Sequence, residues 1–359
     1  TGVLKESATE LVRRVIPEPT RKEKLAALRA GMRLANQRGL TSVLNATGSV
    51  EEMELYAELA RRGELTVRTT TALRLAPELT PDLLKTYEDA RKRFQGPWVR
   101  AGVIKAFADG VIESHTAAML KPYADDPSQS GSTNYSPEQF RSLVGELDRR
   151  GFQVITHAIG DRGIRMVLDA YEAVFKASPP RDRRFRIEHI ENIDPADVPR
   201  LGKLGVIASM QPYHYYPESN LIEVWARNVG PQRVPHSWPT RDLAAGGARL
   251  AFGSDWPVVS LDPFIGIQNA ITRQQANGEP EGGWVGEQRV TLQQALAAYT
   301  RDAAFAQFEE KIKGSLEPGK LADVVVLSQN LFEVPPLAIR QTRVLLTIVG
   351  GRIVHHEGL

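Results

Sequence analysis

Two histidines and one aspartate stand where short apolar segments of the chain end. His157 and His189 end two successive β-rich segments, and Asp255 ends a later one, Phe252-Gly253-Ser254-Asp255-Trp256-Pro257. In a parallel barrel such positions lie at the C-terminal mouth, where these folds keep their chemistry. Imidazole and carboxylate ligands suit a divalent metal, which lowers the pKa of bound water to about 7 and so provides a nucleophile for amide hydrolysis. These residues therefore predict a metal site.

Each of these residues also has a simpler interpretation. His157 and His189 could be partly buried histidines held by hydrogen bonds, which is what one isolated histidine would favour. Two histidines at successive strand ends, followed by a strand-end aspartate, favour metal ligands instead. Asp255 could bind the metal, act as a general base that passes its proton to the leaving amine, or cap the helix that follows.

Lys105 lies inside another β-rich segment, Val103-Ile104-Lys105-Ala106-Phe107. A buried ammonium is costly unless it is paired or neutralised. Its simplest role is an ion pair with Asp109 or Glu188. The alternative is a carbamylated lysine, whose added carboxylate would bridge two metal ions. From the residues alone, the ion pair ranks first.

Three further residues are candidates for substrate contacts. His214 follows a strand in Gln211-Pro212-Tyr213-His214, although it could equally be a loop residue. Asp161 stands in a mouth loop and is equally suited to be a helix N-cap. Trp256 adjoins Asp255, and with several nearby tyrosines and Trp225 it suggests an aromatic pocket for an apolar substituent. Ordinary packing is the alternative for these rings.

The elements that position these residues alternate between strand and helix. Amphipathic helical stretches separate most of the β-rich segments, which predicts parallel βα units. Seven such strands are counted, whereas a closed parallel barrel has eight. The predicted strands are Leu40–Ala46, Leu65–Leu73, Val99–Ala108, Phe152–Ile159, Arg184–Ile190, Val206–Met210 and Leu250–Gly253. The predicted helices are Glu51–Arg62, Pro81–Arg93, Pro137–Arg150, Asp161–Phe175, Pro195–Leu204 and Leu292–Tyr299.

The two ends of the chain have a different character. The first forty residues predict two helices, the second opening with Thr20 and Glu23 in capping-box spacing and ending near Gly39. The last fifty residues are β-rich, at 322–327, 344–349 and 352–355, with a Gly350-Gly351 turn between the last two. We expect a barrel domain over residues 1–310, containing strands two to eight, and a β-sandwich portion over residues 311–359.

Composition narrows the class of protein. The 359 residues are 42% hydrophobic and 25% charged, with a formal net charge of +2, which gives no reason to expect nucleic acid or a membrane surface as a partner. There is no cysteine, so any metal must be held by nitrogen and oxygen. No apolar run reaches the roughly 18–20 residues needed to cross a bilayer. A cytoplasmic protein is the default expectation.

Several motifs, in order along nearly the whole chain, resemble the metal-dependent amidohydrolase superfamily, and within it the branch of N-substituted formamide deformylases and exoenzyme regulatory proteins. The matching segments are 105–111, 116–119 with 122–123, 157–161, 186–190, 210–212 with His214, 252–257, 314–323 and 347–351.

The resemblance implies a distorted (β/α)8 TIM-type barrel joined to a small β-sandwich, and hydrolysis of a C–N bond through one or two divalent ions, zinc by preference. Lys105 then falls on the fourth barrel strand, where many members carry a carbamylated bridging lysine, so the two readings of Lys105 become about even. His157 and His189 fall on the fifth and sixth strands as metal ligands. Asp255 falls on the eighth as metal ligand and proton shuttle.

The resemblance breaks at the first barrel strand. Members of the superfamily end that strand in a His-x-His pair, and no His-x-His occurs in this sequence. The chain therefore resembles the C-terminal two thirds of a longer protein, and the missing eighth strand is the first one of the family. We expect a small amide-like substrate, and either a homo-oligomer or a companion N-terminal segment. The alternative is a non-catalytic or regulatory relative, or a truncated fragment, that binds at most one metal.

Overall fold

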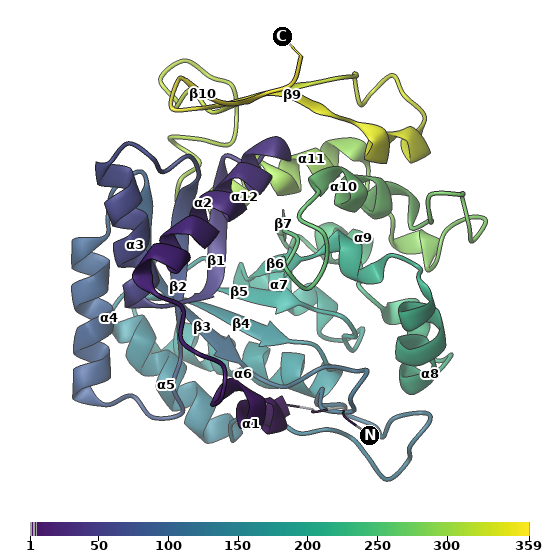
Figure 1. Cartoon of the computed structure of the whole chain (residues 1–359). Helices are drawn as coiled ribbons and strands as arrows, with labels where there is room; N and C mark the ends of the chain where they lie inside the picture. The colour runs from purple at the N-terminus through teal and green to yellow at the C-terminus, as the bar shows by residue number, and fades with distance from the viewer. Residues whose placement is uncertain (1, 3, 5, 359) are drawn as a thin grey trace.

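A single curled sheet of parallel strands carries the candidate residues (Figure 1). The computed structural model describes residues 2, 4 and 6–358. Strands pair in sequence order, so β1 and β7 form the two edges of the sheet in the described part of the chain. The strands are β1 (Ser42–Gly48), β2 (Arg68–Arg74), β3 (Val99–Phe107), β4 (Gln153–Ala158), β5 (Arg186–His189), β6 (Ile207–Met210) and β7 (Leu250–Phe252). The predicted seven parallel strands are confirmed.

Helices between the strands cover the outer side of this sheet, as expected for βα units. Ser49 caps α3, and Thr80 and Ser136 cap α4 and α5, in each case by accepting a hydrogen bond from a backbone N–H of the first turn. These helices are α3 (Val50–Arg61), α4 (Pro81–Arg93), α5 (Pro137–Arg149), α6 (Asp161–Ala177), α7 (Val198–Leu204) and α9 (Thr240–Ala245).

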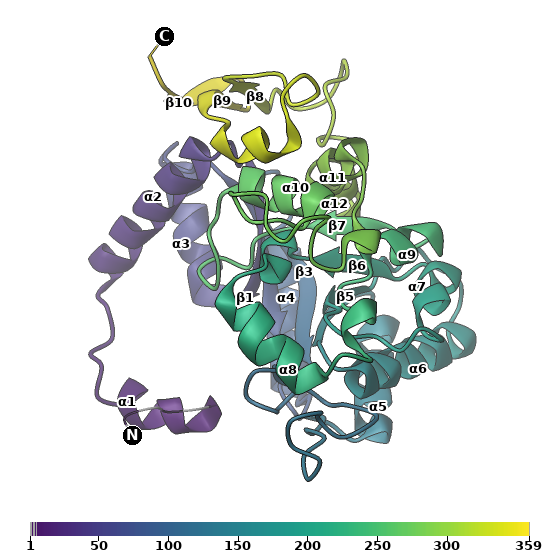
Figure 2. The same cartoon turned by 90° about the vertical axis from the view of Figure 1, so that its right-hand side faces the viewer.

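A second group of helices follows β6 and β7 and lies on the β7 side of the sheet (Figure 2). It comprises the turn η2 (Pro212–Tyr215), the π-helix η3 (Asn220–Trp225), α8 (Ala226–Val229), η4 (Val234–His236), α10 (Pro263–Thr272), η5 (Gly286–Gln288), α11 (Leu292–Tyr299) and α12 (Arg301–Ala306). Of these only α11 was expected as a distinct helix, with the bounds that the structure has.

The N-terminal region has one long helix and two short ones. The long helix α2 (Arg21–Gln37) begins at the predicted capping box, with the Thr20 side chain and Glu23 each bonding the other's backbone N–H. The first expected helix is only two single turns, η1 (Glu6–Thr9) and α1 (Glu10–Arg13). Residues 1, 3, 5 and 359 lie outside the described residues, and with them the outer limits of the two predicted domains.

The predicted β-rich tail forms a three-stranded antiparallel sheet at the end of the barrel opposite the strand C-termini (Figure 1). Its strands are β8 (Val324–Leu327), β9 (Val344–Val349) and β10 (Arg352–His356), and η6 (Pro336–Gln341) precedes β9. Arg68, at the start of β2, binds both Asp323 oxygens at 2.7 and 3.0 Å. Thr347 donates to the carbonyl of Asn36 on α2. These bonds fix the tail sheet to the barrel; a sandwich and a boundary at residue 310 stay predictions.

The two faces of the large sheet bury different clusters. The main core lies between the strands and the outer helices. A small second cluster fills the inner, concave side, where Ala72, Val103 and Ile155 pack together with Leu44 beside them. Because side chains alternate along a strand, residues two positions further on point to the same inner side. Lys105 and His157 are at those positions, so the inner face leads from the packed cluster to the candidate site.

Candidate metal centre

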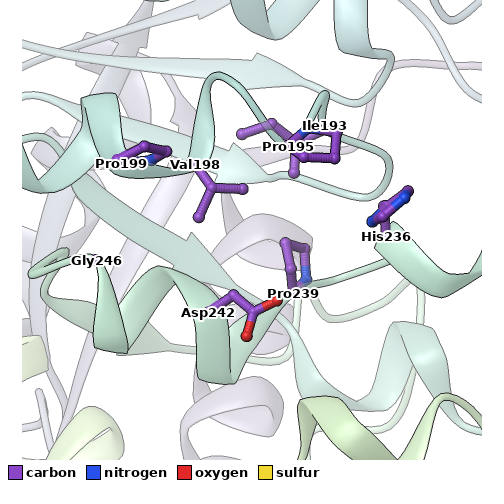
Figure 3. Close-up of a pocket in the computed structure, with 8 residues that line it drawn as sticks. All are labelled: Ile193, Pro195, Val198, Pro199, His236, Pro239, Asp242 and Gly246. Carbon is purple, nitrogen blue, oxygen red and sulfur yellow. The ribbon is translucent and has the colours of Figure 1, made fainter.

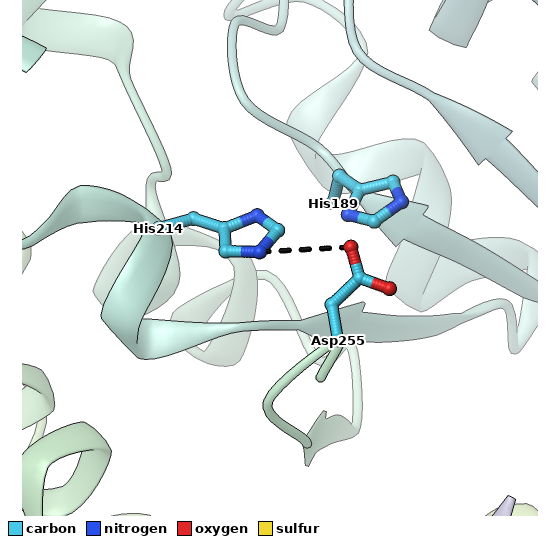
Figure 4. Close-up of side chains that lie close together, drawn as sticks. All are labelled: His189, His214 and Asp255. Carbon is cyan, nitrogen blue, oxygen red and sulfur yellow. Dashed lines mark ion pairs between the residues drawn. The ribbon is translucent and has the colours of Figure 1, made fainter. Parts of the chain in front are cut away.

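Three side chains converge beyond the C-terminal ends of the last strands. His189 is the last residue of β5, His214 lies in η2 after β6, and Asp255 lies three residues after β7. One ligand atom from each lies within 4.8 Å of those of the other two. The two imidazole rings are stacked, with centroids 5.6 Å apart, and Figure 4 shows them beside the Asp255 carboxylate. This spacing suits a shared metal ion.

The backbone around the site is strained. His189, Ile190 and Asp255 have φ values of 79°, 50° and 61°, in the left-handed region that non-glycine residues rarely adopt. Such residues cost about 1–3 kcal/mol each and persist only where the surrounding structure holds them, often at functional sites. The Ile190 N–H donates to the carbonyls of Ala158 and Glu188, which fixes the turn after β5.

Hydrogen bonds set the orientation of His189. Its Nδ1 lies 2.8 Å from the side-chain oxygen of Gln211, and an amide oxygen only accepts. Nδ1 therefore carries the proton, and Nε2 keeps the lone pair that could bind a metal. Gln211 follows β6 directly and was not expected to have this role.

His214 offers a nitrogen that nothing else in the described chain satisfies. Its Nε2 is buried and has no hydrogen-bond partner, while Asp255 Oδ2 lies 3.6 Å away (Figure 4). Buried polar atoms almost always have a partner, so an unpaired ring nitrogen beside a carboxylate indicates a missing ligand. His214 was expected to contact substrate, but the structure groups it with His189 and Asp255.

The histidines are held in their neutral form. Burial lowers the pKa of His214 to about 4, and burial together with Lys105 lowers that of His157 to about 3. Burial also lowers the pKa of His189 well below its usual range. Neutral imidazole is the form that binds metal, so all three rings have an available lone pair at neutral pH.

His157 lies next to this group rather than inside it. Its ring centroid is 4.6 Å from that of His189. Its Nε2 is 3.0 Å from the carbonyl oxygen of Gly110, which can only accept, so Nδ1 is left with the lone pair. The side chain of Asp109 is 3.8 Å away. The structure thus brings His157 to the metal centre, at one side.

Lys105 is buried, with 4% of its surface exposed, and makes no ion pair with any described residue. Both proposed partners are engaged elsewhere. Asp109 accepts three backbone hydrogen bonds, from Ala118, Ile159 and Gly160, and Glu188 pairs with Arg186 at 2.8 Å. Burial lowers the pKa of Lys105, against the opposing charges of Glu188 and Asp255.

Asp255 is poised to exchange protons. Burial raises the pKa of its carboxyl to about 6; Lys105 opposes this rise, and Glu188 adds to it. The side chain is 35% exposed, so it also has access to solvent. A carboxylate with these properties is ionised at neutral pH and able to act as a general base.

The other two substrate candidates are not among the three residues that converge at the metal centre. Asp161 is the first residue of α6, and its carboxylate accepts hydrogen bonds from the backbone of Leu120 and Arg162. That arrangement joins a mouth loop to the helix start. Trp256, 48% exposed, adjoins Asp255. Tyr215 and Trp225 are fully buried in an aromatic cluster, so ordinary packing accounts for those two rings.

A separate surface pocket of about 270 Å³ lies between α7 and α9 (Figure 3). It contains none of the residues of the metal centre. Its histidine, His236, is exposed, and its carboxylate, Asp242, accepts a hydrogen bond from Gln288. We assign it no role in the chemistry.

A curled parallel β/α sheet with histidines and an aspartate converging at its strand ends defines the class of metal-dependent hydrolases built on a barrel. The chain belongs to the amidohydrolase family, whose profile matches residues 1–355. The predicted branch is confirmed, because the similar proteins include an N-substituted formamide deformylase of Arthrobacter pascens, 27% identical over 253 residues, and the exoenzymes regulatory protein AepA of Pectobacterium carotovorum. The deformylase match covers 70% of this chain and 45% of the deformylase.

Other similar proteins match almost the entire chain. Protein LONG AFTER FAR-RED 3 of Arabidopsis thaliana is 34% identical over 365 residues, which cover 98% of this chain and 61% of that protein. The crystal structure of an uncharacterized metal-dependent hydrolase of Pyrococcus horikoshii superposes with a TM-score of 0.78 at 26% identity, over 92% of this chain and 65% of that one. The chain thus spans less than two thirds of the length of each.

Proposed function

We propose that this chain carries the metal centre of a hydrolase that cleaves an amide-type, non-peptide C–N bond in a small molecule through a metal-activated water. The observation that carries the proposal is the buried Nε2 of His214, which has no partner in the described part of the chain and faces Asp255 beside His189. Family membership and the metal-dependent hydrolase of similar structure support it.

The donor set fits a divalent metal such as zinc. His189 Nε2, His214 Nε2 and an Asp255 oxygen would hold it, and three protein ligands with an open position is the usual arrangement at a catalytic zinc. When bound, the metal lowers the pKa of water to about 7 and so supplies the nucleophile. His157 and Lys105 are placed beside this group and would serve a second ion.

The residues of the chain move the proton. Asp255, ionised at neutral pH, accepts the proton that the attacking water loses. As the C–N bond breaks, the same carboxyl donates that proton to the leaving nitrogen, so one proton passes from water to amine. The neutral histidines stay unprotonated throughout because their pKa values lie far below 7.

Lys105 is suited to carbamylation. Its buried amine has no ion-pair partner among the described residues, and the lowered pKa makes the nucleophilic neutral form accessible. The neutral Nζ attacks carbon dioxide, forms an N–C bond and releases one proton to the solvent, so that a buried neutral amine becomes an anion with two oxygen ligands. We propose this modification, with His157 and His189 as its neighbours. An intact-mass gain of one carbon dioxide in bicarbonate, lost in Lys105→Met, tests it.

The unpaired side of β1 in the described chain bears on whether the barrel is complete. Six of the seven residues of β1 are half-buried and one is exposed, and β1 pairs on one side only in the described chain. An eighth strand placed there would close the barrel. We propose that such a strand, from the same or a companion polypeptide, contributes to the active enzyme.

A second candidate is a non-catalytic, regulatory role. It is favoured by the 34% identical plant protein, whose name states no enzymatic activity. The two candidates are separated by assaying the zinc-loaded chain against a panel of N-formyl and N-acetyl amines. Hydrolysis that Asp255→Asn abolishes and Asp89→Asn, on the outer helix α4, leaves intact supports the enzyme. Zinc binding with no turnover of any substrate, also when a segment completing the barrel is supplied, supports the regulatory role.

A further inference from the structure

Strand β2 carries an arginine at each end, and the two have opposite surroundings. Arg68 is 4% exposed and is bound by both oxygens of Asp323. Arg74, at the C-terminal end of the same strand, is exposed, and its guanidinium has no ion pair or hydrogen bond with any residue that the structure describes. Its backbone carbonyl accepts a bond from Tyr87, which fixes the strand end. The second arginine therefore has a free charge at the mouth.

The pairing of the strands gives the direction of the Arg74 side chain. In the β2–β3 ladder Ala72 pairs with Val103, and Arg74 pairs with Lys105. Ala72 and Val103 pack against each other on the inner side of the sheet. Since side chains alternate, Arg74 points to the same inner side as its ladder partner Lys105.

One aromatic ring connects Arg74 with the metal centre. The Arg74 Cζ lies 5.3 Å from the ring centroid of Phe107, and the Lys105 Nζ lies 5.0 Å from it. The His157 ring centroid lies 5.4 Å from that of Phe107. The guanidinium is thus separated from two residues of the site by a single side chain.

We propose that Arg74 binds the carboxylate of the substrate, which makes the preferred substrates N-acylated amino acids. This inference rests on the proposed amide hydrolysis. A guanidinium binds a carboxylate through two parallel hydrogen bonds, and stacking over Phe107 leaves its N–H edges free. Phe107 alone separates Arg74 from Lys105 and His157, and the His157 ring is next to that of His189, so a substrate whose carboxylate binds Arg74 extends toward the metal centre.

The charges around the mouth favour the same orientation. Asp255 follows β7, at the other edge of the sheet from β1 and β2, and the Glu188 carboxylate is already paired with Arg186. The cation of Arg74 on the β2 side attracts a substrate carboxylate. The amide bond then lies toward His189, His214 and Asp255.

A matched pair of substrates tests the inference. The zinc-loaded chain is assayed with N-formylphenylalanine and with its carboxamide, which differ only in the charge. We expect kcat/KM to favour the acid by about 10- to 100-fold, the range for charge-assisted hydrogen bonds. Arg74→Met should bring the ratio close to one by lowering kcat/KM for the acid far more than for the carboxamide, and Arg74→Lys should fall between. Arg352→Met, an exposed arginine on β10, is the control.

An unchanged ratio in Arg74→Met, or an equal loss on both substrates, overturns the inference. Calorimetric binding of N-formylphenylalanine to the Asp255→Asn chain separates this outcome from failure of the proposed function. Binding that weakens in Asp255→Asn/Arg74→Met upholds the carboxylate site even if no amide is hydrolysed. Equal binding by the two proteins contradicts it, whatever the hydrolysis assay gives.

Discussion

At the scale of single residues, His214 shows which parts of the site the sequence can and cannot predict. His157, His189 and Asp255 could be predicted because each directly follows an apolar segment. The role of His214 could not, since it depends on how the turn η2 brings its Nε2 to within 3.6 Å of Asp255. Gln211 was missed for the same reason: its bond to His189 spans 22 positions in the sequence. Such contacts follow from the loop path, which hydrophobic patterns do not encode.

His214→Asn tests whether this histidine binds metal or only substrate. As a metal ligand, its loss should weaken zinc affinity by about tenfold or more, because removal of even a supporting residue of a ligand costs 10- to 100-fold. Competition with a chromophoric chelator measures the affinity. His236→Asn, an exposed histidine, is the control. Unchanged zinc affinity with a raised KM would return His214 to substrate binding.

The raised pKa of Asp255 predicts opposite pH effects on activity and stability. Turnover needs the ionised carboxylate, so kcat should fall as the pH is lowered and this carboxyl takes up a proton. In the metal-free protein, the folded state holds this proton more tightly than the unfolded state, whose pKa is about 3.9. The stabilising contribution is therefore present below about pH 4 and is lost as pH rises through about 6.

Thermal unfolding of the chelator-treated protein tests whether its stability falls as the pH rises. The wild type should lose stability relative to Asp255→Asn between pH 4 and pH 7. A difference in melting temperature that stays constant over this range would show that the pKa of Asp255 is not raised.

At the scale of elements, the sequence was sufficient to predict most of the strands and helices of the barrel. Alternating segments of β-branched and amphipathic character predicted all seven strands, and the bounds of α4 and α11 agree with those predicted. The predicted start of α7 at Pro195 was wrong, because the Ala196 N–H bonds the side chain of Asp194 in a local turn and the helix begins at Val198. Where a helix begins can depend on whether a backbone N–H bonds to a nearby side chain or joins the helix.

The contact between β2 and the tail sheet is also an element-scale feature, and it predicts a stability effect. Arg68 and Asp323 are 4% and 6% exposed, so removal of one partner leaves a buried charge. Asp323→Asn should lower the free energy of unfolding by about 3–5 kcal/mol. Arg68→Met combined with Asp323→Leu should recover much of that loss. Urea denaturation measures both, and equal destabilisation by the single and double variants would argue against a specific pair.

At the scale of the whole molecule, the sequence predicted the order of strands and helices but not the contacts between residues far apart in the chain. The count of strands and the missing His-x-His pair followed from patterns along the chain. The bond between Arg68 and Asp323 joins residues 255 positions apart, and no local signal marks it. The described residues include no helix long and apolar enough to cross a membrane. The chain spans 61% of its plant relative, so the activity of the whole protein is a proposal.

A zinc titration of the metal-free chain, with bound zinc and amide hydrolysis measured on the same samples, tests directly whether this chain is a metal-dependent hydrolase. Hydrolysis should rise in proportion to bound zinc, reach a plateau at one or two ions per chain and be absent in Asp255→Asn. Zinc that binds without hydrolysis, or hydrolysis that is the same in the presence of a chelator, would contradict it.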